Sequence, residues 1–173
     1  MKKTAAIMIF ISVLLSLFSC GKKDDLESYY QYGLYYSIPK DFELQNLPYG
    51  DLTYSNEDEA YFFFNAFDAD ELTEDLLQSP DITPVEYTET YILFLLMDIG
   101  YKYDKKTNTT TFNYVYSYDG EEGEYYFDQE PEFYMHKILR TEDCLYHVTL
   151  TCLEKDRDKY EDLFKRIMDE VSV

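Results

Sequence analysis

The sequence predicts an α+β domain in which an antiparallel sheet of about six strands is flanked by helices. The chain has 173 residues, enough for one domain with a sizeable core. Its 20 Tyr and 12 Phe residues favour strands and an aromatic core over a helical bundle. Short polar turns separate several strand-like segments, and two segments repeat apolar residues at helical spacing. The sequence shows no internal repeat and no second domain.

Three strand-like segments open the domain. We expect "YYQYGLYYSIPKDFEL" to form one strand closed by Pro39, which has no N–H for a sheet ladder. A short strand, "DLTYSN", follows. The segment "EAYFFFNAF" at 59–67 is apolar on both faces, so we expect it inside the sheet. An acidic helix is expected from Asp68 to Gln78, before Pro80.

A longer helix is expected to begin after Thr83 and to end at Gly100. Thr83 suits the N-cap, Pro84 the first helical position and Gly100 the C-terminal end. Its apolar run "YILFLLM" is too short to span a membrane, so the helix is expected to pack on the core. The residues expected on the core face recur at helical spacing: Val85, Thr88, Ile92, Leu95, Leu96 and Ile99. Leu93, Phe94 and Met97 are expected to widen this face.

The rest of the chain predicts an antiparallel meander and a terminal helix. A polar turn at Asp104–Asn108 joins two strands, and the acidic loop "DGEEGE" and a turn at Thr141-Glu142 separate the later ones. On the strand after the first of these turns, four aromatic residues share one face: Phe112, Tyr114, Tyr116 and Tyr118. The segment 155–171 is amphipathic, with a core face of Tyr160, Leu163, Phe164, Ile167 and Val171.

The N-terminus has the parts of a bacterial export signal. Met1-Lys2-Lys3 is basic, and residues 4–18 are apolar but too short for a comfortable membrane span. Leu17-Phe18-Ser19-Cys20 resembles the lipobox of bacterial lipoproteins, although Phe18 is bulkier than most residues at its position. The alternative is a secretory signal peptide in which the cysteine is incidental.

The lipobox resemblance implies a division of the chain into three parts. Residues 1–19 would be a signal peptide, and residues 20–28 an acylated cysteine and a polar tether. Residues 29–173 would form a single α+β domain. Palmitate and further acyl chains on Cys20 would anchor the protein durably to a membrane outside the cytoplasm. The tether "GKKDD" also resembles surface-export signals of some Gram-negative lipoproteins, and a simple solvated linker explains it equally well.

The charge of the chain excludes one large class of partners. It has 35 acidic and 15 basic residues, which gives a net charge of -20. Such a surface repels phosphate backbones, so we do not expect nucleic-acid binding.

The two histidines are the candidates for a metal site or a catalytic centre. A hairpin with Thr141-Glu142 at its tip would place His136 directly opposite His147, with about 5.5 Å between their Cβ atoms. Two imidazoles could bind a transition metal, but a zinc site needs a third or fourth ligand. Tyr134 and Thr149, the next residues on that face, are not usual zinc ligands. The simpler interpretation is a polar and aromatic patch under a helix or at a groove.

Other metal-binding and catalytic patterns are incomplete. The segment "DADELTEDLLQS" begins like a calcium loop, but it lacks the glycine and the final glutamate that such a loop needs. The chain has no G-x-S-x-G, no C-x-x-C and no phosphate-binding glycine loop. Cys144 and Cys152 would lie about 27 Å apart on one strand, too far to form a disulfide. We therefore expect no cofactor and favour a non-enzymatic function.

The tyrosines suggest a binding surface instead. One group lies in the first strand-like segment at Tyr29, Tyr30 and Tyr32, and a second at Tyr125-Tyr126 beside the acidic loop. Exposed tyrosines make rigid, amphipathic contacts that suit protein or glycan binding. The alternative is that they belong to the core and its rim.

The order of elements resembles the Mog1/PsbP-like fold. The opening "YYSIPKDF" strand, the central strand, the mid-chain helix, the antiparallel meander and the terminal helix carry this resemblance over residues 30–171. It implies an antiparallel sheet between helices, an α/β/α sandwich, and a binding or assembly factor without a shared catalytic site. No functional residue of that family maps onto a numbered position here.

Three functional hypotheses follow. The first is a membrane-tethered, non-catalytic binding or assembly module of the bacterial cell envelope, on the cell surface or beneath it, with a protein or small-ligand partner. The second is an envelope hydrolase or metal-dependent enzyme centred on His136 and His147. The third is an immunity-type lipoprotein that binds a basic toxin, which fits the charge but no particular residue. The ligand, the membrane leaflet and the oligomeric state do not follow from the sequence.

Overall fold

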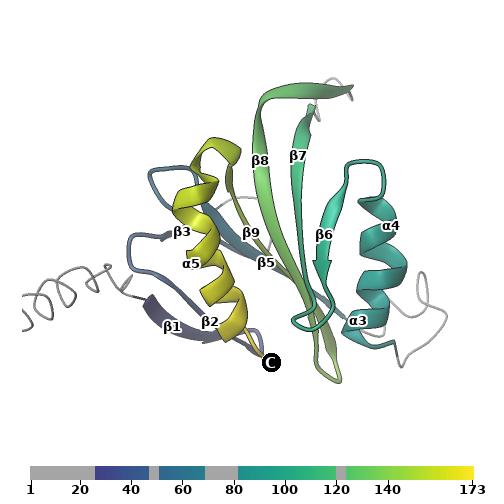
Figure 1. Ribbon diagram of the computed structural model, residues 1–173. Helices are drawn as coiled ribbons and strands as arrows, with labels where there is room; N and C mark the ends of the chain where they lie inside the picture. Colours follow the sequence, from purple (N-terminus) through teal and green to yellow (C-terminus); the bar gives the residue numbers. More distant parts are fainter. Residues whose placement is uncertain (1–25, 47–50, 69–81, 120–123) are drawn as a thin grey trace, which may run out of the picture.

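Two antiparallel sheets form the framework of the molecule (Figure 1). The computed structural model describes residues 26–46, 51–68, 82–119 and 124–173, and for residues 115–129 it describes only the backbone where it is included. In these ranges the larger sheet has seven strands in the order β3-β4-β5-β9-β8-β7-β6, and the smaller sheet has two, β1 and β2. The strands are β1 (Leu26–Gln31), β2 (Leu34–Pro39), β3 (Glu43–Gln45), β4 (Leu52–Ser55), β5 (Tyr61–Asp68), β6 (Tyr101–Asp104), β7 (Thr109–Asp119), β8 (Glu124–Arg140) and β9 (Cys144–Leu153).

The predicted α+β class with an antiparallel sheet is confirmed. The strands are more numerous than expected because the first strand-like segment contributes three of them, β1, β2 and β3. That segment turns back on itself at Tyr32-Gly33, where both residues have positive φ angles of 53° and 81°. Such angles are those of a two-residue type I′ hairpin turn. The expectation of one continuous strand is therefore wrong, although β2 does end at Pro39.

The segment expected inside the sheet lies there. β5 is hydrogen-bonded to β4 on one side and to β9 on the other. Phe62 and Phe64 are fully buried on one of its faces, while Tyr61 and Phe63 are half-buried on the other. The predicted acidic helix at Asp68–Gln78 falls outside the described residues, except for Asp68, which ends β5.

The mid-chain helix begins as predicted, at a capping box. The Thr83 side chain accepts a hydrogen bond from the N–H of Glu86, and the Glu86 carboxylate accepts one from the N–H of Thr83. The helix then runs through α3 (Pro84–Tyr87), a π-helical turn (Thr88–Ile92) and α4 (Leu93–Leu95).

The π-helical turn changes which residues of this helix face the sheet. A π turn takes up more residues than an α turn, so it rotates the residues that follow it around the helix axis. Thr88 and Leu96 are buried as expected, but Leu95 is 73% exposed. Phe94 and Met97 are exposed as well. The predictions that Leu95 faces the core and that Phe94 and Met97 widen the core face are wrong for this reason.

The second half of the chain forms a meander of long strands. The predicted turn at Asp104–Asn108 connects β6 with β7, and β7 and β8 continue together beyond the rest of the sheet (Figure 1). Their register shifts between Tyr114 and Tyr116. The side chains of Tyr116 and Tyr118 lie outside the description, so the predicted four-residue aromatic face is seen only at Phe112 and Tyr114, whose rings both contact Tyr134.

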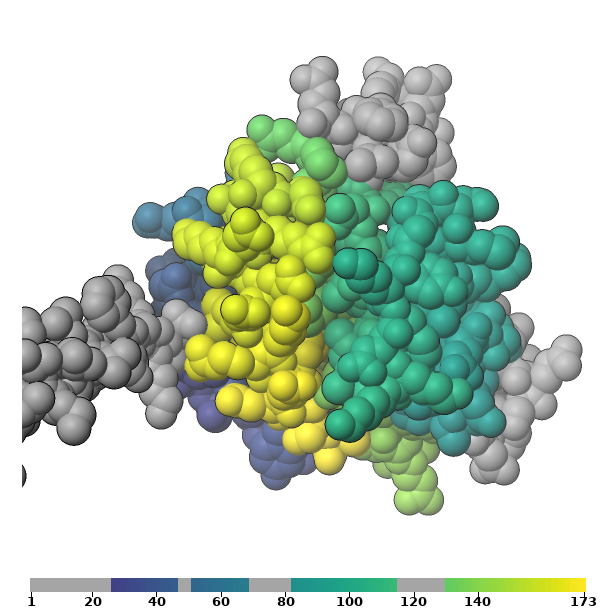
Figure 2. All heavy atoms as spheres, viewed as in Figure 1, coloured from purple at the N-terminus to yellow at the C-terminus, as the bar shows by residue number. Residues whose placement is uncertain are grey.

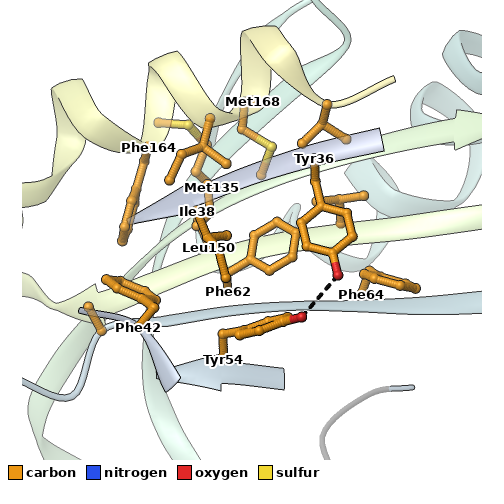
Figure 3. Close-up of a cluster of buried hydrophobic side chains, with 14 of the residues drawn as sticks. Tyr36, Ile38, Phe42, Tyr54, Phe62, Phe64, Met135, Leu150, Phe164 and Met168 are labelled. Atoms are coloured by element: carbon orange, nitrogen blue, oxygen red, sulfur yellow. Dashed lines mark hydrogen bonds between the residues drawn. The ribbon is translucent and has the colours of Figure 1, made fainter. Parts of the chain in front are cut away.

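One face of the seven-stranded sheet is covered by β2 and by α5 (Arg157–Glu170), as Figure 3 shows. The predicted core face of the terminal helix is confirmed, since Phe164 and Ile167 are fully buried. Tyr36 and Tyr54 share a hydrogen bond of 3.1 Å between their hydroxyls inside this core. The side chains buried between the layers include Ile38, Phe42, Phe62, Phe64, Met135, Val148, Leu150, Phe164 and Met168.

The opposite face of the sheet is covered at one end by α3 and the π-helical turn. Tyr87, Ile138 and Leu145 form a second, smaller cluster of buried side chains there. With helices on both faces, the domain has the α/β/α arrangement that the fold resemblance implied.

The structure bears on the N-terminal region only at its end. The predicted signal peptide and Cys20 lie outside the described residues. β1 begins at Leu26, so the last three residues of the segment expected as a tether belong to a strand. Within the part of the chain that the structure describes, no helix is long and apolar enough to cross a membrane.

Candidate functional site

The two histidines are neighbours, but not in the register that the sequence predicts. His136 pairs with Thr149, and His147 pairs with Ile138. The register differs by two residues because the turn is centred on Glu142-Asp143, one residue further along the chain than predicted, and is closed by the hydrogen bonds between Thr141 and Cys144. A shift of two residues keeps every side chain on its face. The imidazole rings are therefore diagonal neighbours, with centroids 5.4 Å apart.

Aromatic side chains surround this histidine pair. The rings of Phe67 and Tyr87 lie edge-on to His147, with centroid distances of 4.9 and 5.4 Å. Burial lowers the pKa of His136 to about 3, with a further contribution from His147, and burial lowers the pKa of His147 to about 4. Both histidines are therefore neutral at pH 7.

The pair has few partners for metal binding. Among the described residues, no group of three or more His, Cys, Asp and Glu side chains could hold a metal ion. The buried Nε2 atom of His147 has no hydrogen-bond partner in the described part of the chain. Thr149, directly opposite His136, is not a usual zinc ligand. At this place the geometry shows a packed polar and aromatic patch beneath α3.

The tyrosines that were expected to form a binding surface differ in their exposure to solvent. Tyr30 and Tyr32 are 60% and 64% exposed, and Tyr30 stacks on the exposed Tyr35 at a centroid distance of 4.2 Å. Tyr29 is half-buried and stacks on Tyr36. The side chains of Tyr125 and Tyr126 lie outside the description. The β1–β2 hairpin thus presents an exposed tyrosine cluster of Tyr30, Tyr32 and Tyr35.

A groove between α5 and β6 is a feature that the sequence did not reveal. Two adjoining hollows, with volumes of about 390 and 230 Å³, lie on the α5 face of the sheet and share Lys102 and Thr111. Lys102 pairs with Thr111, and Thr111 pairs with Met135, so these three residues form a row across β6, β7 and β8. Figure 2 shows α5 and the β6–α4 region side by side on this face, with a narrow furrow between them.

The groove contains several of the chain's few cations. Arg157 donates to Glu161 at 2.8 Å and lies over the Phe133 ring at 4.3 Å. Lys165 pairs with Glu161 at 3.0 Å. Lys102 is exposed, and its ammonium group has no ion pair among the described residues. In a chain with a net charge of -20, this lysine remains available to a ligand.

The rest of the groove combines hydroxyl, apolar and acidic groups. Its larger hollow is lined by Thr109, Met135 and Met168, and its charged lining residues include Asp104, Lys165 and Asp169. Such a lining can contact an apolar group and orient a polar one. Sequence reasoning missed the groove because its walls come from segments about 60 residues apart.

An exposed apolar patch lies at the end of α4, close to the groove. Phe94, Leu95 and Met97 are 68%, 73% and 63% exposed. Ile99, Gly100 and Tyr101, which follow in the chain, line the smaller hollow. The patch results from the rotation that the π-helical turn introduces, so helical spacing alone could not predict it.

Comparisons with known proteins give a limited result. No protein-family model matches the chain, and no curated protein matches it. Among solved structures, the chain is similar to the solution structure of cyanobacterial PsbP (CyanoP) from Synechocystis sp. PCC 6803, with a TM-score of 0.49 and 12% sequence identity. The match covers 89% of this chain and 96% of that chain. This similarity concerns the fold alone, and its degree carries no argument about function.

Proposed function

We propose that this protein is a lipid-anchored, non-catalytic binding module of the bacterial cell envelope that holds its partner in the groove between α5 and β6. The groove itself is the observation that carries the proposal, because Lys102 lines both of its hollows and has no ion pair among the described residues. Its larger hollow is within the size range of about 300–1,000 Å³ that is usual for ligand pockets. The lipid anchor rests on the lipobox resemblance around Cys20.

The lining of the groove indicates the chemistry of the partner. Lys102 can pair with a carboxylate or phosphate group without first breaking an ion pair in the described part of the chain. Met135 and Met168 offer an adaptable apolar surface beside it. The partner we propose is therefore a small ligand or protein segment with an acidic group next to an apolar one.

The two other hypotheses have less support. The histidines lie beneath α3 among aromatic rings, and no specific observation favours an enzyme centred on them. The immunity hypothesis rests on net charge alone.

A charge reversal in the groove tests the proposal. The full-length protein and its Lys102→Glu variant would be extracted in mild detergent from the cells that produce them, and bound molecules quantified by mass spectrometry. We expect Lys102→Glu to reduce the amount of a specifically bound partner about tenfold, which corresponds to about 1.4 kcal/mol.

Lys106 provides a matched control for this experiment. It lies in the β6–β7 turn, outside the lining of both hollows. Lys106→Glu makes the same change in net charge, and we expect it to leave the bound partner unchanged. Equal retention by the native protein and both variants would contradict the proposal, and an equal loss in both variants would reduce it to an effect of net charge.

A further inference from the structure

A hollow lies on the sheet face opposite the groove, beyond the end that α3 covers. It has a volume of about 320 Å³ and is lined by Tyr61, Phe63, Glu132, Tyr134 and Thr151. These residues share their face of the sheet with His136 and His147, but they lie nearer the other end of the strands. Tyr61, Phe63 and Tyr134 are half-buried, so their rings are partly open to a ligand.

The strand register explains the shape of this hollow. Tyr61 pairs with Thr151 from one side and Tyr134 pairs with it from the other, so a small residue lies between two large rings. Neighbouring strands are about 4.8 Å apart, which puts the backbones of the two tyrosines about 10 Å apart. A group held above Thr151 would therefore be about 5 Å from either side. Side chains stand roughly perpendicular to a sheet, so the two rings would flank that group, and a cation interacts with a ring face within about 6 Å of the ring centroid.

Glu132 places a carboxylate beside these rings. Its carboxylate accepts hydrogen bonds from the hydroxyls of Tyr134 and Thr151. Burial raises the pKa of the Tyr134 hydroxyl, so it remains a donor to Glu132. Phe112 stacks on Tyr134 at a centroid distance of 5.1 Å and an interplanar angle of 4°, which holds that wall in place.

Among the described residues, no basic side chain forms an ion pair with this carboxylate. None of the five lining residues is a cation. A half-buried carboxylate beside three aromatic rings would stabilise a bound cation, because the ligand supplies the positive charge that the lining residues lack. The net charge of -20 would also raise the local concentration of cations.

We infer that this hollow binds a small organic ammonium ion, with its cationic group between Tyr61 and Tyr134 and paired with Glu132. Aromatic rings and a carboxylate are the groups that recognise alkylammonium ions. Calcium and magnesium require several oxygen ligands around one point, and the lining supplies a single carboxylate. The site is separate from the groove at Lys102, so it does not depend on the function proposed above.

Choline and its neutral carbon isostere, in which a tert-butyl group replaces the trimethylammonium group, test this inference. Binding of each to the full-length protein in mild non-ionic detergent would be measured by calorimetry at constant ionic strength. We expect saturable binding of choline and at least about fivefold weaker binding of the isostere, which corresponds to about 1 kcal/mol. Equal affinities for the two, or no saturable binding of choline, would overturn the inference.

Three variants locate the site. Glu132→Gln keeps the shape of the side chain but removes its charge, and we expect it to weaken choline binding about fivefold. Tyr61→Leu removes one ring and should weaken choline binding while leaving the isostere little affected. Glu142→Gln removes an exposed acid at the tip of the β8–β9 hairpin and serves as the control for net charge. Choline affinity that is unchanged in both Glu132→Gln and Tyr61→Leu, or lowered equally by Glu142→Gln, would place binding elsewhere.

Discussion

At the scale of single residues, a half-buried lysine shows how a charge can be accommodated between the sheet and a helix. Lys137 interrupts an apolar face of β8 in the sequence, and its ammonium donates to the carbonyl oxygens of Met168 and Val171, at 2.6 and 3.4 Å. Carbonyl groups at the C-terminus of a helix lack partners within the helix and attract cations. Burial lowers the pKa of Lys137, and its two acceptors compensate for its loss of water. The lysine therefore fastens the end of α5 to the sheet.

The buried histidines predict a loss of stability in mild acid. In the unfolded chain each has a pKa near 6.5, whereas the folded values are about 3 for His136 and about 4 for His147. The unfolded state therefore binds more protons below pH 6.5, so the free energy of unfolding falls as the pH falls. Each histidine should contribute a loss of about 2 kcal/mol between pH 6.5 and about pH 5.

Urea denaturation at a series of pH values would measure this loss. A variant with both His136→Gln and His147→Gln should show a much shallower slope between pH 6.5 and about pH 5. The carboxylates with lowered pKa, such as Asp58 and Glu161, titrate below this window, so they do not obscure the comparison. An unchanged slope in the double variant would show that the histidines are not held neutral by the fold.

At the scale of elements, the parts that could be predicted are those determined by nearby residues. The N-cap at Thr83 and the core face of α5 depend on residues within a few turns of one another, and both predictions are confirmed. Which residues at the end of the mid-chain helix face the sheet depends on a π-helical turn, and the pattern of nearby residues does not predict that turn. The register of β8 and β9 depends on which two residues of the polar run 141–143 form the centre of the turn, and polar character alone does not specify them.

Neither the groove nor the aromatic hollow could be predicted from sequence spacing. The groove unites Lys102 with Lys165, and the aromatic hollow unites Tyr61 with Tyr134 and Thr151. Each set is assembled only when strands and helices far apart in the chain are placed side by side. By contrast, the nearness of His136 and His147 was predicted because both belong to one hairpin.

The β1–β2 hairpin provides a prediction at the same scale. Gly33 has a φ of +81°, and a Cβ atom added there would be 2.7 Å from the Tyr146 hydroxyl oxygen, which donates to the Tyr32 carbonyl. Gly33→Ala should therefore combine a backbone cost of about 1–2 kcal/mol with a steric clash that weakens this hydrogen bond. We expect a total loss of about 2–4 kcal/mol in the free energy of unfolding, measured by urea denaturation.

Gly100 is the matched control. Its φ is +79°, and a Cβ atom added there would meet nothing within 4 Å. Gly100→Ala should show the backbone cost alone, about 1–2 kcal/mol. If the two variants were equally stable, the contact between Tyr146 and the turn would contribute nothing.

At the scale of the whole molecule, the groove at Lys102 and the aromatic hollow at Thr151 open on opposite faces of one sheet. α5 covers part of one face and α3 with the π-helical turn covers part of the other, so each face is partly open. β1 and α4 lie at opposite sides of the molecule (Figure 1). If Cys20 carries the lipid, the chain between it and the first strand is short, because β1 begins at Leu26. Six residues span at most about 20 Å, so the domain would be held close to the membrane surface.

The position of the anchor gives the last prediction. Cys20 stands where the apolar segment ends and the polar tether begins, and acylation requires its thiol. Cys20→Ala should leave the signal peptide uncut or release the protein from the membrane fraction, since alanine cannot be acylated. Ser19→Gly, a neighbouring change to another small residue, should leave both processing and fractionation as they are. Mass spectrometry of the mature N-terminus and fractionation of membranes would measure the two effects, and a Cys20→Ala protein that is processed and retained like the native one would refute the lipid anchor.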